Sequence, residues 1–149
     1  MKNRGFTKSQ RDFFDRIASV RNFLAIMQPL EGISFFVKDE NFRLIFANPY
    51  FFRRLGFKFE KDILGKDDFE LFPEPLARKF RKDDQTVMQS SNPMIGLVEL
   101  FLNQQGVPAW YLTNKFPIFD SNGRGIGVMG TVQRYEKSDQ NLSRDELIE

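Results

Sequence analysis

The alternation of apolar and polar residues near the end of the chain predicts two antiparallel strands joined by a tight turn. The first strand alternates from Trp110 to Ile118, and the second begins near Gly125. The segment 120–123 (DSNG) lies between them and supplies Asn and Gly, which tolerate the positive φ angles of hairpin turns. A strand pair this apolar is marginally stable alone, so we expect the rest of the chain to cover it.

Three earlier segments predict further strands of the same sheet. The first two, Gly32–Lys38 and Phe42–Ala47, flank a polar turn and are expected to form a hairpin. The third, Ile95–Asn103, leads through a Gly-containing turn into the Trp110 strand. The chain therefore predicts an α+β fold, a five-stranded antiparallel sheet with helices inserted after the second strand.

Helices are predicted between the second and third strands. Asn48 is a strong N-cap and Pro49 suits the first helical position, so a short helix should follow them. A longer helix is expected from about Glu74 to Gln89, with Lys79 on its outer side. Its inner stripe consists of Leu76, Ala77, Phe80, Asp84, Val87 and Met88. We expect these helices to cover one face of the sheet.

The N-terminal segment has the spacing of one amphipathic helix, from Ser9 as its N-cap to Gln28, just before Pro29. The apolar residues that alternate at intervals of four and three are Phe13, Ile17, Val20, Leu24 and Met27. This heptad-like spacing is typical of a seam between helices. Because further apolar residues widen the stripe, the helix either packs on its own domain or builds a dimer interface, and both interpretations stay open.

Composition narrows the function classes. The 149 residues suit one domain, and 18 of them are Phe, so we expect a strongly aromatic interior. The absence of Cys and His removes thiolate chemistry, disulfides and the commonest general base, metal ligand and haem ligand, and we expect no metal site. A net charge of +2 is weak evidence for nucleic-acid binding, and we expect none by this segment. We also expect a cytoplasmic location, because the sequence shows no membrane span and no secretory signal.

The order of these elements resembles a PAS domain, the sensory fold of many bacterial signalling proteins. The resemblance is carried by GISFFVKDENFRLIFANPYFFRRLGF, GKDDFELFPEPLARKF and GVPAWYLTNKFPIFDSNGRGIGVMGTVQRY. The sequence is most similar to the PAS modules that precede the DNA-binding domain of AraC-type regulators, or that precede kinase and cyclase output domains. The resemblance covers residues 31–136, so the expected organisation is an amphipathic helix at 1–30, a PAS domain at 31–136 and a polar tail at 137–149. The tail is expected to lead to an output domain beyond residue 149.

The resemblance also implies which cofactors the chain lacks. Light-sensing PAS proteins form a flavin adduct through a Cys, and haem-binding ones commonly use a His on the long helix. This chain contains neither residue, so cysteinyl flavin and His-ligated haem are excluded. Phe101 and Tyr111 stand where flavin-binding members have flavin-contacting Asn, which argues against non-covalent flavin. No cofactor is expected.

The alignment with flavin-binding PAS members implies that Tyr111, Thr113 and Lys115 lie on the side of the sheet that faces the helices. An inward Lys in a Phe-rich interior is costly unless it is paired, so we expect a carboxylate partner. The candidate partners are Asp84, which we favour, and Glu99 and Asp68. One interpretation is a buried ion pair that ties the sheet to the long helix. The other is that Lys115 binds an anionic group of a small ligand, at a site formed by Tyr111, Thr113, Lys115, Glu99, Phe101, Asp84, Phe80 and Met88.

The opposite face of the Trp110 strand is apolar and usually would mark an interaction surface. We expect the N-terminal helix to cover it, in its own subunit or in a partner's, and we predict a homodimer. The predicted interface residues are Phe13, Ile17, Val20, Leu24, Met27, Trp110, Leu112 and Phe116.

The chain is thus expected to be a non-catalytic sensory and dimerisation module of a bacterial signal-transduction or transcription-regulatory protein. A small-molecule ligand would lie between the sheet and the long helix. The alternative is a purely structural dimerisation module without a ligand. A small enzyme is disfavoured, because His and Cys are absent and no carboxylate pair has a catalytic context.

Overall fold

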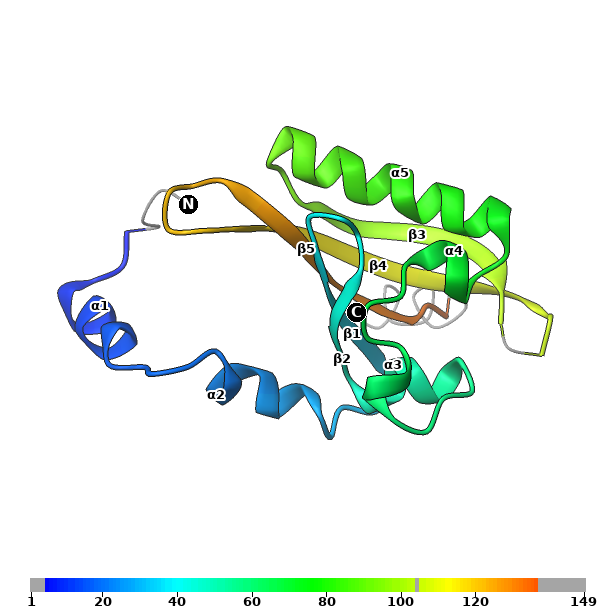
Figure 1. The fold of residues 1–149 in the computed structure, drawn as a ribbon, viewed down its shortest axis with the longest axis horizontal. Coiled ribbons are helices and arrows are strands. Elements are labelled where there is room, and N and C mark those ends of the chain that lie inside the picture. Colours follow the sequence, from blue (N-terminus) through cyan, green and yellow to red (C-terminus); the bar gives the residue numbers. More distant parts are fainter. Residues whose placement is uncertain (1–4, 104, 137–149) are drawn as a thin grey trace, which may run out of the picture.

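A computed structural model describes residues 5–103 and 105–136. Its centre is a five-stranded antiparallel sheet with the strand order β2-β1-β5-β4-β3 (Figure 1). The strands are β1 Ile33–Asp39, β2 Leu44–Ala47, β3 Met94–Leu102, β4 Pro108–Phe119 and β5 Gly125–Arg134. The predicted fold class is therefore confirmed. The last strand in the sequence, β5, lies in the middle of the sheet, between β1 and β4.

Four helical segments connect β2 to β3: α3 Pro49–Arg54, the 3-10 helix η2 Glu60–Asp62, α4 Asp68–Leu71 and α5 Glu74–Ser90. As expected, Asn48 caps α3, because its side chain accepts a hydrogen bond from the backbone N–H of Phe51. Asp67 caps α4 in the same way, through the backbone N–H of Glu70. α3 packs on β1, whereas α5 packs on β4 and β5, so these helices cover one face of the sheet.

The apolar core lies between the β1–β2 hairpin and the helices that follow it. It consists of Phe36, Leu44, Ala47, Phe51, Phe52 and Ile63. Asn48 is fully buried beside this core and satisfies all four hydrogen-bonding positions of its amide. Its Oδ1 accepts from the N–H groups of Phe35 and Phe51, and its Nδ2 donates to the carbonyls of Ile33 and Met27. One side chain thereby joins β1, α3 and the N-terminal segment.

Two glycines on β5 leave space that neighbouring groups fill. A Cβ on Gly130 would lie 2.6 Å from Cζ of the Phe36 ring and 2.6 Å from the carbonyl oxygen of Asn114. A Cβ on Gly127 would lie 2.2 Å from the carbonyl oxygen of Lys38. Gly125, on the same strand, has no atom nearer than 4.0 Å to such a Cβ. The close approach of β1 to β5 therefore depends on Gly127 and Gly130.

The N-terminal segment differs from the prediction of one continuous helix. It forms α1 Lys8–Asp15, α2 Arg21–Leu24 and the 3-10 helix η1 Ala25–Met27. The N-cap of α1 is Thr7 rather than Ser9, since Thr7 forms a capping box with Gln10. The break occurs where Ser19 accepts a hydrogen bond from the backbone N–H of Arg21, and this local bond competes with helix continuation.

The predicted apolar seam is consequently divided between separate helical pieces. No residue of α1, α2 or η1 is buried, and Figure 1 shows α1 and α2 extending away from the sheet. The segment therefore does not cover the Trp110 face within its own subunit, as one of our interpretations required. The predicted polar tail, 137–149, lies outside the described residues.

Candidate functional site

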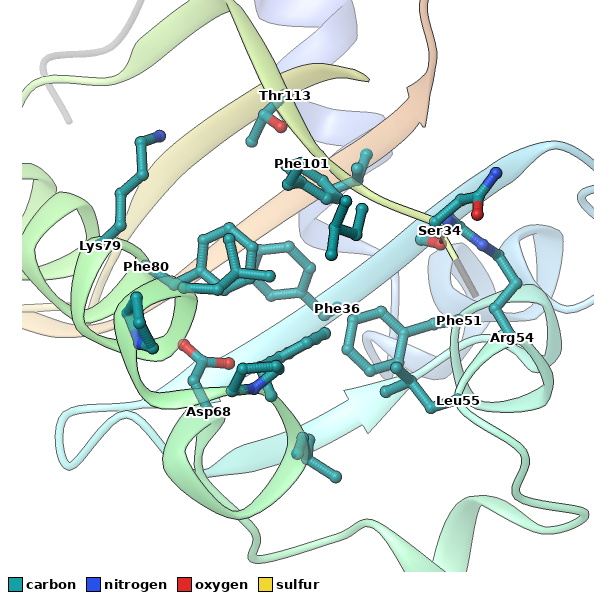
Figure 2. Close-up of a pocket in the computed structure, with 18 of the residues that line it drawn as sticks. Ser34, Phe36, Phe51, Arg54, Leu55, Asp68, Lys79, Phe80, Phe101 and Thr113 are labelled. Atoms are coloured by element: carbon teal, nitrogen blue, oxygen red, sulfur yellow. Dashed lines mark hydrogen bonds between the residues drawn. The ribbon is translucent and has the colours of Figure 1, made fainter. Parts of the chain in front are cut away.

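A cavity of about 720 Å³ lies between the inner face of the sheet and the helices α3, α4 and α5. Its wall is mainly aromatic and aliphatic, with a few polar side chains. Figure 2 shows the rings of Phe36 and Phe51 between Asp68 on one side and Arg54 on the other. Phe80 and Phe101 line a further part of the wall. A volume of this size suits a small-molecule ligand.

Four charged side chains form a buried cluster beside this cavity. Lys115 Nζ donates to Asp84 Oδ1 at 2.7 Å, as the sequence predicted. The other oxygen of Asp84 accepts from Lys38 Nζ, also at 2.7 Å. Lys38 Nζ donates as well to Asp68 Oδ2 at 2.6 Å. All four residues are at most 3% exposed, so β1, β4, α4 and α5 are joined by buried ion pairs.

Electrostatics within the cluster keep Lys38 charged. Burial lowers the pKa of Lys38, but the charges of Asp84 and Asp68 and their hydrogen bonds outweigh it and raise the pKa above its ordinary value. Asp68 behaves differently. Its burial raises the pKa of Asp68 above the ordinary value, and the opposing charge and hydrogen bond of Lys38 do not cancel this effect. Asp68 therefore gives up its proton less readily than an exposed aspartate.

The two alternative partners of Lys115 are engaged elsewhere. Asp68 binds Lys38, and Glu99, which is 5% exposed, pairs with Lys79. Lys79 does not point away from the sheet, as the helix pattern predicted, but reaches across to β3 and lines the cavity. Its long aliphatic stem allows the ammonium group of an outer helical position to reach a buried carboxylate.

A row of aromatic rings connects the two ends of the site. Phe72 contacts Phe80, and Phe80 contacts Phe101, with centroid separations of 5.2 Å and 5.9 Å. Phe101 stacks on Tyr111, with centroids 4.0 Å apart and planes inclined by 5°. Tyr111 in turn faces the guanidinium group of Arg54, which lies 5.3 Å from the ring centroid. The row therefore runs from α4 to the last turn of α3.

Arg54 lies where this cavity meets a smaller one. The smaller cavity measures about 300 Å³ and shares Arg54 and Asn103 with the larger. The Arg54 guanidinium group donates to Ser34 Oγ at 3.4 Å and to the Tyr111 hydroxyl at 3.3 Å, and both acceptors are neutral. It also lies 5.4 Å from the ring of Tyr50. Arg54 is thus held by aromatic and neutral groups.

The structure places the eight predicted site residues in four settings. Those that line the larger cavity are Thr113, Lys115, Phe101 and Phe80. Tyr111 is buried and lines the smaller cavity. Asp84 and Glu99 are buried and hold Lys115 and Lys79 from behind the wall. Met88 is half-buried on α5 and does not line either cavity.

Sequence reasoning missed five polar wall residues: Ser34, Lys38, Arg54, Lys79 and Asn103. For two of them a signal existed, because Ser34, Phe36 and Lys38 alternate along β1 and so share one face of the strand. The neighbouring Phe35 is also buried, on the opposite face, and this obscured the alternation. Arg54 had no comparable signal, since its role depends on which groups fold around it.

The face opposite the cavity is apolar and largely uncovered. In β4, Trp110, Leu112 and Phe116 are half-buried and alternate with buried inward residues, as predicted. Beside them on β3 lie Val98 and Leu100, which are 37% and 55% exposed. The role of the eight predicted interface residues in dimerisation stays a prediction.

Comparison with protein families identifies the fold. A family model described as the PAS fold matches residues 32–135. The chain belongs to the PAS family. A comparison with curated protein sequences finds no match.

Solved structures with the same fold include several PAS-containing regulators. The chain matches the VqmA dimer of Vibrio cholerae, described as a LuxR-type receptor, with a TM-score of 0.67 and 22% identity over 80% of this chain and 53% of that one. It matches a phage VqmA–DPO complex with a TM-score of 0.68 and 20% identity, over 95% and 62% of the two chains. The PAS domain of Bordetella pertussis BvgS matches with a TM-score of 0.63 and 19% identity, over 85% and 95%.

These likenesses, together with the family match, establish the PAS fold. This chain spans 51% to 62% of the length of the VqmA chains that it matches. Within the described residues, no helix is long and apolar enough to cross a membrane.

Proposed function

We propose that this PAS domain is a non-catalytic sensor that binds a small molecule in the cavity between the sheet and α5. The observation that carries the proposal is the cavity itself, about 720 Å³ lined by aromatic rings and a few polar groups. Two of the similar solved structures are complexes of VqmA with DPO, which supports a ligand in this fold. No cofactor is part of the proposal.

The sensor would act on a neighbouring output domain by a population shift. A ligand contacts β5 through Val132, which lines the cavity, and β5 leads directly to the segment after residue 134. A ligand that favours one packing of the cavity wall would therefore bias the orientation of whatever follows the sheet. We place this activity in a cytoplasmic bacterial regulator, with a homodimer formed by the apolar outer face.

Two observations favour a ligand over a purely structural domain. The first is that a void remains beside Lys115 although Asp84 already satisfies this lysine. The second is that the polar side chains Ser34 and Thr113 are buried on the wall of a mainly apolar cavity. In a domain that only dimerised, apolar side chains would fill this space at lower cost.

Binding of indole, a small neutral aromatic probe, tests the proposal. We expect indole to shift the backbone amide resonances of Phe36, Phe80 and Thr113 in wild-type protein. Two filling variants, Leu76→Trp and Val132→Phe, occupy the cavity from α5 and from β5 and should remove the shifts. Ile45→Trp, at a site that is 55% exposed and outside the cavity, is the matched control and should retain them. Shifts that persist in both filling variants would contradict a ligand cavity. The absence of any shift in wild-type protein would contradict it as well.

A further inference from the structure

The cations on the cavity wall are not equally neutralised. The wall carries Lys38, Lys79, Lys115 and Arg54. The three lysines each pair with a buried carboxylate. Among the described residues, Arg54 forms no ion pair, and its two hydrogen-bond acceptors are neutral hydroxyls. The uncompensated positive charge of the wall therefore lies at the Arg54 end.

The lysine end of the cavity is poorly suited to an anion. An anionic group beside Lys115 would lie near Asp84, whose two oxygens are both within 2.7 Å of a lysine nitrogen. Asp68 brings a second carboxylate to within 2.6 Å of Lys38. The attraction of the two lysines for a third anion is therefore largely opposed by the two carboxylates already present.

Arg54 has the chemistry to bind a carboxylate. A guanidinium group has five N–H donors in a planar fork that matches a carboxylate in a bidentate geometry. Ser34 and Tyr111 use two of these donors through long hydrogen bonds of 3.4 Å and 3.3 Å. Tyr50 and Tyr111 contact the group through their rings, and Arg54 lines both cavities. Ser34 Oγ and the Tyr111 hydroxyl also lie at this end and could donate to the same anion once Arg54 is engaged.

We propose that the ligand of this cavity is an apolar carboxylate, with a flat hydrophobic body among the Phe rings and its carboxylate bound by Arg54. The inference rests on the proposed function, since it requires that the cavity bind a small molecule. It moves the anionic end of the ligand away from Lys115, where the sequence had placed it. The buried ion pairs of Lys38 and Lys115 then have a structural role, since they hold together the end of the cavity opposite Arg54.

The test compares two probes of nearly equal shape, benzoate and benzamide, by amide chemical shifts in wild-type protein at neutral pH. We expect benzoate to bind at least about tenfold more tightly, because only benzoate offers an anion to the guanidinium group. In Arg54→Gln this preference should fall to within about twofold. Arg53→Gln removes the neighbouring charge from the same helix at an exposed position outside both cavities, and it should retain the preference.

A second measurement needs no substitution at Arg54. The side-chain ¹⁵N resonances of Arg54 should shift on addition of benzoate and stay in place on addition of benzamide. Equal binding of the two probes would overturn the inference. A benzoate preference that survives in Arg54→Gln and disappears in Lys115→Met would overturn it too. In both cases the proposed ligand cavity would stand. Binding of neither probe at about 10 mM, together with no indole binding, would overturn both.

Discussion

Lys115 and Asp84 join the middle of β4 to α5 through a fully buried ion pair, with Nζ and Oδ1 2.7 Å apart. Asp84 also holds Lys38, so its loss would leave two buried lysines without this carboxylate. We expect Asp84→Ala to reduce the free energy of unfolding by about 3–5 kcal/mol, measured by urea denaturation. Lys115→Met should cost less, because Asp84 keeps Lys38 as a partner.

The neighbouring residue on α5 provides the control for this prediction. Asp83 pairs with Lys79, whose side chain is 49% exposed, at 3.6 Å. Because half-exposed ion pairs contribute little, Asp83→Ala should cost less than about 1 kcal/mol. Equal losses for Asp83→Ala and Asp84→Ala would show that the buried cluster is not special for stability.

The glycines of β5 give a second prediction. Gly130→Ala places a Cβ against the Phe36 ring and the Asn114 carbonyl, and we expect it to lower the free energy of unfolding by about 1–3 kcal/mol. Gly127→Ala should cost at least as much, since its contact is with a backbone oxygen that no side-chain rotation can move. Gly125→Ala is the control and should be nearly neutral in the same denaturation experiment. A large effect at Gly125 alone would contradict this explanation.

Asn48 gives a third prediction. Asn48→Ala removes the acceptor of two buried N–H groups and the donor to two carbonyls. We expect a loss of about 2–3 kcal/mol in the free energy of unfolding, because a helix cap and buried backbone partners are lost together. Asn48→Asp preserves Oδ1 and should retain hydrogen-exchange protection at Phe51 N–H better than Asn48→Ala does. The same protection in both variants would mean that the Asn48 cap does not determine it.

Asp68 provides a prediction for pH. Since the folded pKa of Asp68 is raised, the folded protein binds this proton at a pH where the unfolded chain does not. The contribution of Asp68 to stability should therefore increase as pH falls through its folded pKa, and be complete below the ordinary aspartate value of about 3.9. The free energy of unfolding of wild type relative to Asp68→Asn should rise on acidification from pH 7 to pH 4.

The titration itself can be followed directly. The ¹³C carboxyl resonance of Asp68, assigned by its absence from Asp68→Asn, should have a midpoint above the ordinary aspartate value. A midpoint at or below that value would show that the attraction of Lys38 outweighs the cost of burial.

Self-association gives the fifth prediction. The exposed apolar residues of β3 and the half-buried ones of β4 form a surface that a second copy could cover. We expect sedimentation at tens of micromolar (about ten times a typical micromolar dissociation constant) to detect a dimer. Deleting residues 1–30 should weaken it, while Leu100→Lys on the sheet should weaken it further. A monomer at this concentration would contradict the prediction.

The sequence predicts the inner face of β4 well because its alternation is regular. A period of two puts Tyr111, Thr113 and Lys115 on one face, and the resemblance to flavin-binding PAS domains implies that this face is the inner one. The choice of Asp84 follows from the helical stripe and the cost of an unpaired buried charge. These arguments need only local periodicity, the family resemblance and one packing contact. They therefore survive without knowledge of the complete sheet order.

The remaining site residues depend on information that local patterns do not contain. Lys38 reaches Asp84 only because β1 pairs with β5, and nothing in the β1 segment specifies that distant neighbour. Whether a carboxylate lies beside Arg54 depends on which groups the whole fold brings around it, and local sequence patterns do not specify them. The helix break near Ser19 has a local origin instead of a long-range one. One side-chain hydrogen bond there overrides a regular apolar spacing.

The central position of β5 has a consequence for the order in which the protein can fold during synthesis. Until the ribosome has made residues 125–134, β1–β2 and β3–β4 are two separate hairpins without the strand that joins them. Neither hairpin can complete the cavity, because Lys38 of its wall comes from β1 and Lys115 from β4. The domain should therefore fold late, after nearly all of its chain has emerged, and a nascent chain ending before Gly125 should remain open to proteases.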